Sequence, residues 1–274
     1  MQVVHLRGLD DPRFVDRELY RAMGDHQRLR AAGLFVAEGR LVVARLIERH
    51  RGLVRSLLLN GAAYHALRSE DSAFGDEVNV FVCETADFEP LTGYDIHRGC
   101  LALAVRPPAR VIDDVIAAAR TLVVVEEVAN ADNVGGIFRN AAAFGVDGVV
   151  LSRGCVDPLY RKAIRTSMAA VLTIPFAVAD GEWRATLEAI RRGGFQLVAL
   201  TPDPSAVDLD TFSCGARGNR LALLVGAEGQ GLTPESTDAA DVRVRIPIRG
   251  EVDSLNVSVA TGIALHRLAV PMSG

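Results

Sequence analysis

Three predominantly apolar segments constrain the fold of this 274-residue chain more than any other feature. They lie at 121–128, where the segment ends in Glu126-Glu127, at 195–200 and at 221–225. Apolar runs without polar alternation are typical of strands buried on both faces, as in parallel sheets covered by helices. Shorter strands are expected at 149–151 and 242–248. Helical patterns separate and follow these strands, at 134–144, 159–170, 183–192 and 254–268. The sequence therefore predicts an α/β domain built on a parallel sheet.

The first 105 residues repeat this alternation on a smaller scale. Strands are expected at 54–59, 78–83 and 100–105, with a helix at 39–50, which indicates a small α/β sandwich. Two consecutive prolines follow at Pro107 and Pro108, and proline fixes φ and removes an amide donor. We therefore predict a domain at 1–105, a linker at 106–112 and a second domain at 113–274.

The composition excludes several classes of protein. Apolar residues make up 49% of the chain and the net charge is −4, which excludes a disordered chain. No apolar stretch approaches the roughly 18 residues that span a membrane, and the first residues lack the apolar segment of a signal peptide. The four cysteines are scattered without a CxxC pair. We therefore expect a cytoplasmic protein with reduced cysteines, no membrane partner and no metal.

Arginine dominates the basic residues, because Lys162 is the only lysine among the 30. Codon usage in a GC-rich genome is one explanation of this bias, and selection for phosphate binding is the alternative. Residues 1–55 carry 11 basic and 7 acidic side chains. On a helical wheel, four of these bases share one face, which predicts a contact with RNA phosphates. They are Arg13, Arg17, Arg21 and Arg28. A solvated face that contacts nothing is the alternative.

The first candidate functional segment follows the strand at 121–128. Ligands of parallel sheets bind at the carboxyl ends of strands, so the loops there are informative. Asn133 is placed to cap the next helix. Gly135 and Gly136 weaken its first turn by up to about 1 kcal/mol each relative to alanine, which is typical of a close approach by a ligand or another backbone. Arg139 follows in this helix. An ordinary capped helix with a surface arginine is the alternative.

Two further segments follow the strands at 221–225 and 242–248. Gly226, Gly229 and Gly231 permit positive φ and leave backbone amides accessible, although a tight turn without a ligand is the alternative. The pattern is neither GxGxxG nor a P-loop, which disfavours dinucleotides and triphosphates. In the last segment a helix is expected to begin at Ser254, with Asn256 facing the same side. The small residues Ala260, Gly262 and Ala264 in this helix would allow close packing against another subunit.

In their order and spacing, the three segments resemble the motifs of the SpoU family of RNA ribose 2′-O-methyltransferases, within the SPOUT superfamily. The motif Asn-x-Gly-x-x-x-Arg matches 133–139, and Gly-x-Glu-x-x-Gly-Leu matches 226–232. Ile-Pro-x-x-Gly followed by Ser-Leu-Asn-Val-Ser-x-Ala matches 246–260. The resemblance covers 113–274. Ala227 stands where many members have Asn, and Ala131-Asp132 replaces a frequent Pro. The first of these departures is expected to alter the cofactor loop slightly.

The resemblance implies S-adenosylmethionine bound in a deep trefoil knot at the carboxyl end of the sheet, and a homodimer. It implies these residues at the cofactor: Leu200, Thr201, Gly226, Ala227, Gly231, Ile246, Ile248 and Leu255. It implies these catalytic residues: Arg139, Asn133, Glu228, Ser254 and Asn256. The domain at 1–105 is similar to the ribosomal-protein-like RNA-binding domain of many members. Ribosomal RNA is therefore the favoured substrate, and transfer RNA is the alternative.

In the family, the residue that matches Arg139 is proposed to activate the hydroxyl. Lowering its pKa to about 7 would cost ~8 kcal/mol, and charged arginine has no acceptor lone pair. We expect Arg139 to hold a phosphate or to stabilise the developing alkoxide. Asn133, Ser254 and Asn256 would orient the ribose, while Glu228 would support the loop or Arg139. A non-catalytic RNA-binding protein and a nucleotide-dependent oxidoreductase are the other hypotheses, and the missing GxGxxG disfavours the latter.

Overall fold

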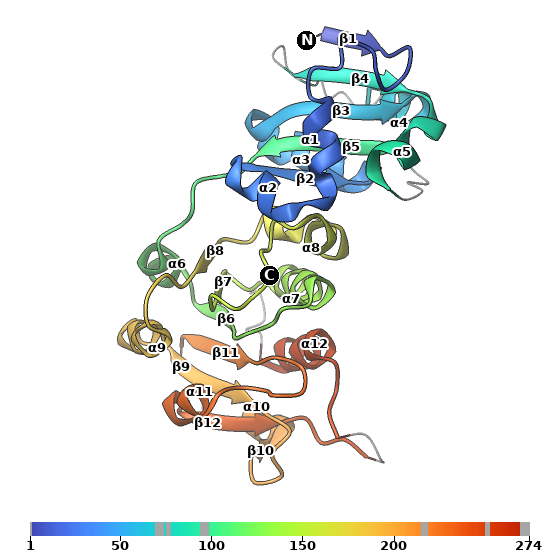
Figure 1. Cartoon of the computed structure of the whole chain (residues 1–274). Helices are drawn as coiled ribbons and strands as arrows, with labels where there is room; N and C mark the ends of the chain where they lie inside the picture. The colour runs from blue at the N-terminus through green and yellow to red at the C-terminus, as the bar shows by residue number, and fades with distance from the viewer. Residues whose placement is uncertain are drawn as a thin grey trace. The chain divides into compact units, whose positions relative to one another are not determined.

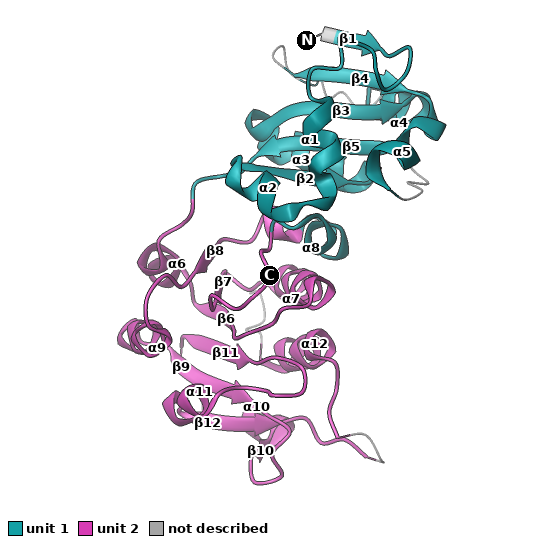
Figure 2. Ribbon diagram, in the orientation of Figure 1, with its two compact units in different colours: residues 1–108, 159–169 teal, residues 109–158, 170–274 magenta. Residues whose placement is uncertain are grey.

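The computed structural model describes residues 2–68, 74, 78–93, 99–214, 219–249 and 253–268. It divides into two compact units (Figures 1 and 2). Unit 1 comprises 1–108 and 159–169, and unit 2 comprises 109–158 and 170–274. The predicted division assigned 159–169 to the second domain. This segment instead carries α8 (Arg161–Thr166), whose Arg161 and Arg165 bond to Glu38 at 3.1 and 3.4 Å. These two ion pairs join the segment to unit 1.

Unit 1 is built on a five-stranded mixed sheet in the order β1-β4-β3-β5-β2. Its strands are β1 (Gln2–His5), β2 (Leu34–Glu38), β3 (Val54–Asn60), β4 (Asn79–Cys83) and β5 (Cys100–Val105). The pairs β1–β4 and β3–β4 are parallel, whereas β5 runs antiparallel to β2 and β3. The three strands expected from sequence are present to within a residue at each end. They form the centre of the sheet, where long apolar runs are buried.

The helices of unit 1 are mostly short. They are α1 (Arg17–Arg21), α2 (His26–Ala31), α3 (Arg40–His50), α4 (Gly61–Arg68), α5 (Phe88–Thr92) and α8. The prediction that Arg13 to Arg28 share one helical face is wrong. Arg13 precedes α1, and a 3-10 turn (Ala22–Gly24) separates α1 from α2. Asp25 then starts a new helix, because its carboxylate accepts a hydrogen bond from the amide of Arg28.

Unit 2 is built on a seven-stranded sheet in the order β10-β12-β9-β11-β6-β7-β8. Its strands are β6 (Thr121–Val125), β7 (Gly148–Leu151), β8 (Phe176–Val178), β9 (Gln196–Leu200), β10 (Val207–Asp208), β11 (Leu221–Val225) and β12 (Val242–Arg245). Every pairing among these strands is parallel, which confirms the predicted sheet. The central strands β6 and β11 are buried along their whole length. β6 ends before residue 128, and Glu127 turns the chain with a φ of 55°.

Helices cover both faces of this sheet, with α6, α9 and α11 on one side and α7, α10 and α12 on the other (Figure 1). They are α6 (Ile112–Ala118), α7 (Ala131–Ala143), α9 (Trp183–Arg192), α10 (Leu209–Cys214), α11 (Pro234–Ala239) and α12 (Val257–Leu268). Within the described ranges, no helix is long and apolar enough to cross a membrane. The trefoil knot stays a prediction.

The contact between α7 and α12 positions the candidate site. A Cβ atom added at Gly136 of α7 would lie 2.7 Å from the side chain of Ser258 on α12. One at Gly262 of α12 would lie 3.0 Å from the side chain of Asn140 on α7. The Asn140 amide also donates to the Ser258 carbonyl at 2.6 Å. Gly262 therefore serves packing inside the chain, and the contact of this helix with another subunit stays a prediction.

Candidate active site

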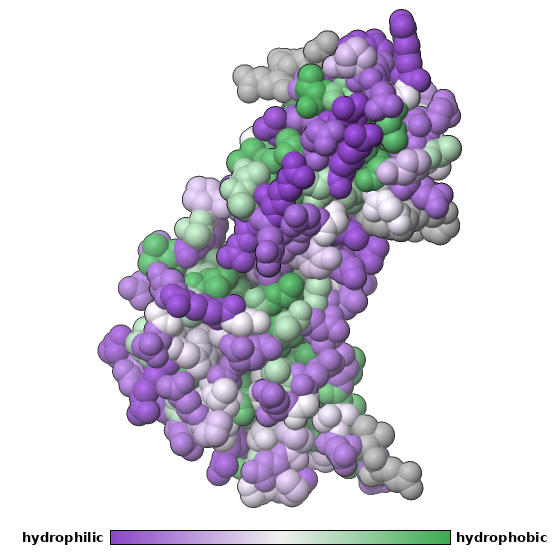
Figure 3. Space-filling model, viewed as in Figure 1, coloured by the Kyte–Doolittle hydropathy of each residue, from purple (hydrophilic) through white to green (hydrophobic). Residues whose placement is uncertain are grey.

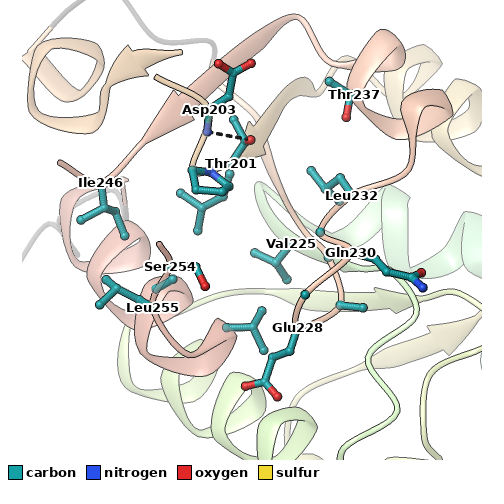
Figure 4. Close-up of a pocket in the computed structure, with 18 of the residues that line it drawn as sticks. Thr201, Asp203, Val225, Glu228, Gln230, Leu232, Thr237, Ile246, Ser254 and Leu255 are labelled. Carbon is teal, nitrogen blue, oxygen red and sulfur yellow. Dashed lines mark hydrogen bonds between the residues drawn. The ribbon is translucent and has the colours of Figure 1, made fainter. Parts of the chain in front are cut away.

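A pocket of about 380 Å³ lies at the carboxyl end of the unit 2 sheet, where the segments after β9, β11 and β12 meet (Figure 4). Its volume falls in the range typical of small-molecule sites. All eight residues predicted at the cofactor line this pocket: Leu200, Thr201, Gly226, Ala227, Gly231, Ile246, Ile248 and Leu255. Three hydroxyl side chains, those of Thr201, Ser254 and Thr237, lie around it (Figure 4). The structure thus gathers residues from three separate sequence segments at one cavity.

The glycine loop (226–232) forms one wall of the pocket. It closes on itself through an isolated bridge, in which the Gly231 amide donates to the Ala227 carbonyl at 2.9 Å. A Cβ atom at Gly226 would lie 2.2 Å from the Gly231 carbonyl carbon, so no larger residue fits there. Gly229 has a φ of 86°, a conformation that side chains with a Cβ atom rarely adopt. The glycines are therefore required by a tight turn that is at the same time a pocket wall.

Beside the pocket lies the amide–carboxylate cluster, which comprises Asn133, Glu228 and Asn256. The side-chain amide of Asn256 donates to Asn133 Oδ1 at 2.9 Å and to Glu228 Oε1 at 2.8 Å. These residues belong to α7, the glycine loop and the start of α12. The cluster joins three of the five predicted catalytic residues, and Ser254, the fourth, lines the adjacent pocket.

The structure corrects two details of how helices begin at this site. Asn133 does not cap α7, because the cap is Asn130, whose side chain accepts from the Asp132 amide at 2.8 Å. Asn133 is instead buried within the first turn. The last helix begins at Val257 and not at Ser254. Its cap is Asn256, whose Oδ1 accepts from the amide and the hydroxyl of Ser258 at 3.0 and 2.8 Å.

Arg139, the fifth predicted catalytic residue, is exposed on α7. Within the described part of the chain, no hydrogen bond or ion pair engages its guanidinium. At 100° per residue, Arg139 shares the exposed face of α7 with Asp132, while Gly136 and Asn140 face α12. The structure therefore does not bond Arg139 to the amide–carboxylate cluster, and leaves its charge available. Gly250 of the third motif lies outside the described residues.

The arginines predicted to bind RNA are mostly engaged by acidic neighbours in unit 1. Arg13 bonds to Asp11 at 2.6 Å, Arg17 to Asp10 at 2.8 Å and Arg21 to Glu18 at 3.1 Å. The Arg13 side chain and the amides of Arg13 and Arg7 hold the pKa of Asp11 well below its usual range. Hydrophilic side chains gather over α1 and α2 (Figure 3). This surface is polar, but three of the four arginines predicted to contact RNA are paired with carboxylates.

Glu126 directly follows β6, and the sequence motifs assign it no role. The residue is 2% exposed, and its carboxylate bonds to Thr233, the residue directly after the glycine loop. The signal was an acidic residue at the end of a buried strand, but its partner is 107 residues away in the sequence. Among the described residues, no group of three or more His, Cys, Asp and Glu side chains is placed to hold a metal ion.

Comparisons with known proteins agree with this geometry. The SpoU rRNA Methylase family model matches residues 120–266. A tRNA/rRNA methyltransferase of Mycobacterium tuberculosis, itself uncharacterized, is 38% identical over 94% of this chain and 88% of its own length. The AdoMet-bound rRNA methyltransferase from Sinorhizobium meliloti is similar in structure, with a TM-score of 0.80 and 26% identity over 98% of each chain. The SpoU methyltransferase AviRb from Streptomyces viridochromogenes shares the fold, with a TM-score of 0.74 and 23% identity over 92% and 95% of the two chains.

Proposed function

The chain belongs to the SpoU rRNA methylase family, and we propose that it transfers a methyl group from S-adenosylmethionine to a ribose 2′-hydroxyl of structured RNA. Methyl transfer to RNA is the activity of the family, and the acceptor atom is the finer part of the proposal. One observation carries it. The pocket that contains all eight expected cofactor residues lies directly beside the amide–carboxylate cluster, and Glu228 belongs to both.

The lining of the pocket fits S-adenosylmethionine. Leu200, Ile246 and Leu255 offer apolar side chains for the faces of the adenine ring. The glycine loop offers backbone groups for its edge, because three of its residues carry no side chain. When bound, S-adenosylmethionine supplies an electrophilic methyl group. The residues around the pocket then have to bind the RNA, orient its hydroxyl and exclude water.

Arg139 is proposed to hold an RNA phosphate or to stabilise negative charge on the reacting oxygen. Its planar guanidinium suits either role, since it donates two parallel hydrogen bonds to a phosphate and stays charged at any working pH. Its exposure and the absence of a described partner support the proposal. Asn133 also keeps a buried donor, Nδ2, without a partner among the described residues. An unpartnered buried donor is costly and is readily explained if a ligand completes the site.

Asn256 has a different proposed role from the one its motif suggested. Its amide nitrogen donates both hydrogens within the chain, and its oxygen accepts three hydrogen bonds from the first turn of α12. No donor is left for the ribose. We therefore assign Asn256 to positioning Asn133 and Glu228, and leave orientation of the ribose to Asn133 and Ser254.

Ribosomal RNA is the proposed substrate, with transfer RNA as the second candidate. The Sinorhizobium neighbour, which matches both units, is named an rRNA methyltransferase, whereas the mycobacterial relative is named for both RNAs. RNA binding by unit 1 is part of the proposal. Exposed ion pairs such as Arg17–Asp10 are worth only about 0–1 kcal/mol, so a phosphate can replace the carboxylate at low cost. Arg28 lacks an ion pair in the described part of the chain.

A homodimer is also proposed. Val259 and Ile263 lie one helical turn apart on α12 and remain 51% and 38% exposed. Exposed large apolar side chains at helical spacing are typical of a surface that another chain covers. Sedimentation of the purified protein would test this directly, since a monomer at micromolar concentration would contradict it.

The central test uses the purified protein, methyl-labelled S-adenosylmethionine and RNA from cells that lack the gene. We expect label in ribosomal RNA and, after digestion to nucleosides, in a 2′-O-methylated nucleoside. Transfer RNA from the same cells is the parallel substrate. Label in transfer RNA alone would select the second candidate, and label on a base would contradict the proposed acceptor atom. Cofactor binding without transfer to either RNA would indicate the non-catalytic RNA-binding protein.

A further inference from the structure

We propose that Glu228 accepts the proton of the ribose 2′-hydroxyl during methyl transfer, an inference that rests on the proposed function. In this reaction the 2′ oxygen forms a bond to the methyl carbon of a sulfonium donor. The carbon–sulfur bond breaks, and its electron pair stays on sulfur. The hydroxyl proton leaves to a base, so the site needs a group that can take up a proton.

The other polar groups of the site are unsuited to this task. The guanidinium of Arg139 is fully protonated and has no acceptor lone pair. The side chains of Asn133 and Asn256 are amides, which do not take up protons near neutral pH. Ser254 carries a hydroxyl that would itself need a base. Among the described residues at the pocket and the amide–carboxylate cluster, only Asp203 and Glu228 are titratable.

Asp203 is engaged elsewhere. Its carboxylate accepts from the amide of Ser205 at 2.8 Å and lies 3.8 Å from Arg243 of β12. The hydrogen bonds from Ser205 lower the pKa of Asp203, which makes it a weaker base. It also belongs to the segment after β9, whereas the cluster is formed by α7, the glycine loop and α12. Asp203 and Glu228 lie at opposite sides of the pocket (Figure 4).

Glu228 is held by one oxygen and leaves the other available. Its Oε1 accepts from Asn256 at 2.8 Å, and no described donor bonds to Oε2. The side chain is exposed, and its carboxyl group points away from Val225 and Leu232 on the inner wall of the pocket (Figure 4). A carboxylate at the rim of the pocket, fixed by one hydrogen bond and open at the other oxygen, is suited to receive a proton.

The Asn256 side chain that donates to Glu228 is itself held in place. Asn256 caps the 12-residue helix α12, where its oxygen is bound to the Ser258 amide, the Ser258 hydroxyl and the Val259 amide. With its oxygen held in this way, the side-chain nitrogen of Asn256 faces Asn133 and Glu228 and donates to both. The glycine loop that carries Glu228 is closed by the Ala227–Gly231 bridge. The carboxylate therefore keeps its position before any substrate binds, which reduces the reorganisation that proton transfer requires.

The substitution Glu228→Gln separates proton transfer from support of the loop. Glutamine keeps an oxygen that accepts from Asn256, but it cannot take up a proton. We expect the rate constant for methyl transfer at saturating RNA to fall by about 10²–10⁴-fold, the usual range for loss of a general base. Affinity for S-adenosylmethionine, measured by calorimetry, and the melting temperature should remain at the wild-type values. Glu235→Gln, at an exposed glutamate in the first turn of α11, is the matched control and should leave all three unchanged.

Rate as a function of pH supplies a second readout. A general base must be unprotonated to act, so the wild-type rate should be lower on the acid side. This dependence should be lost in Glu228→Gln. The other titratable or charged groups on the described elements that meet here are Asp132 and Arg139 of α7, Arg249 and Asp253 before α12, and His266 and Arg267 in the last turn of α12. Asp132→Asn and Asp253→Asn should therefore keep the wild-type profile.

The outcomes separate this inference from the proposed function. If the wild-type protein methylates RNA and Glu228→Gln retains its rate, Glu228 is not the base and the inference is overturned. A weaker cofactor affinity that accounts for the whole loss of rate would overturn it as well. If the wild-type protein transfers no methyl group to any RNA, the proposed function itself fails.

Discussion

The buried carboxylate of Glu126 accepts two hydrogen bonds from Thr233, one from its amide at 3.0 Å and one from its hydroxyl at 2.8 Å. Glu126 directly follows β6, and Thr233 directly follows the glycine loop. The hydroxyl of Thr233 also caps α11 by accepting from the Ser236 amide. A carboxylate at the end of a central strand thus fixes the far end of the loop that lines the pocket.

This pair predicts that the hydroxyl of Thr233 controls the cofactor site. Thr233→Val removes one of the two donors and leaves a buried carboxylate incompletely bonded, which should cost about 1–3 kcal/mol of stability. Because the loop then loses an anchor, affinity for S-adenosylmethionine should fall as well. Calorimetry and urea denaturation measure the two effects. Thr233→Ser retains the hydroxyl and is the control. Equal affinities in the two variants would show that the hydroxyl does not act on the loop.

Arg139 is predicted to act through its planar guanidinium and not merely through its charge. Arg139→Ala should lower the rate of methyl transfer by about 10²–10³-fold, as expected when a preorganised donor to a developing anion is lost. Arg139→Lys keeps the charge but cannot donate two parallel hydrogen bonds, so it should recover only part of the rate. Cofactor affinity should not change, since Arg139 does not line the pocket. Near-full turnover of Arg139→Lys would refute the bidentate role. Arg184→Lys, on the exposed face of α9, is the control.

Gly136 is predicted to be indispensable to the contact between α7 and α12. Alanine is the better helix former by up to about 1 kcal/mol, but its Cβ would lie 2.7 Å from the Ser258 side chain. The steric overlap with Ser258 should outweigh the gain in helix propensity and destabilise the protein by about 1–3 kcal/mol. Because Ser258 donates to Asn256, displacement of α12 should also lower activity. Gly61→Ala, where a Cβ meets nothing within 4 Å, is the control and should be neutral or stabilising. A stable, fully active Gly136→Ala would contradict the prediction.

The sequence was most informative where a pattern is long and local. The helix Trp183–Arg192 and the strand Leu221–Val225 have the bounds expected from their patterns. The two-residue edge strand β10 and the N-terminal strand β1 were not expected, because short strands leave little periodic signal. The break between α1 and α2 consists of the 3-10 turn (Ala22–Gly24) and a new cap at Asp25, and helical-wheel geometry ignores both.

The candidate site was predictable in part for a similar reason. Parallel topology brings the carboxyl ends of strands to one edge, so the expected loops meet at the pocket. The hydrogen bonds between them were not predictable. Asn256 and Asn133 are 123 residues apart, and only the packing of α12 on α7 makes them partners. The choice between Asn130 and Asn133 as the cap of α7 likewise depended on a one-turn difference in where the helix begins.

Two buried thiols in unit 1 predict how stability depends on pH. Burial raises the pKa of Cys83 and of Cys100 to about 12, from 9.0 in an exposed thiol. Between these values the folded protein holds protons that the unfolded chain releases. The stabilisation is therefore fully present below pH 9 and is lost as the pH rises toward 12, with a slope of at most about 1.4 kcal/mol per pH unit for each thiol. Burial also raises the pKa of Tyr20.

Urea denaturation at pH 8, 9 and 10 should show this decline in stability, and a variant with Cys83→Ala and Cys100→Ala should show a shallower one. Parallel declines in the two proteins would mean that other groups determine the alkaline loss of stability.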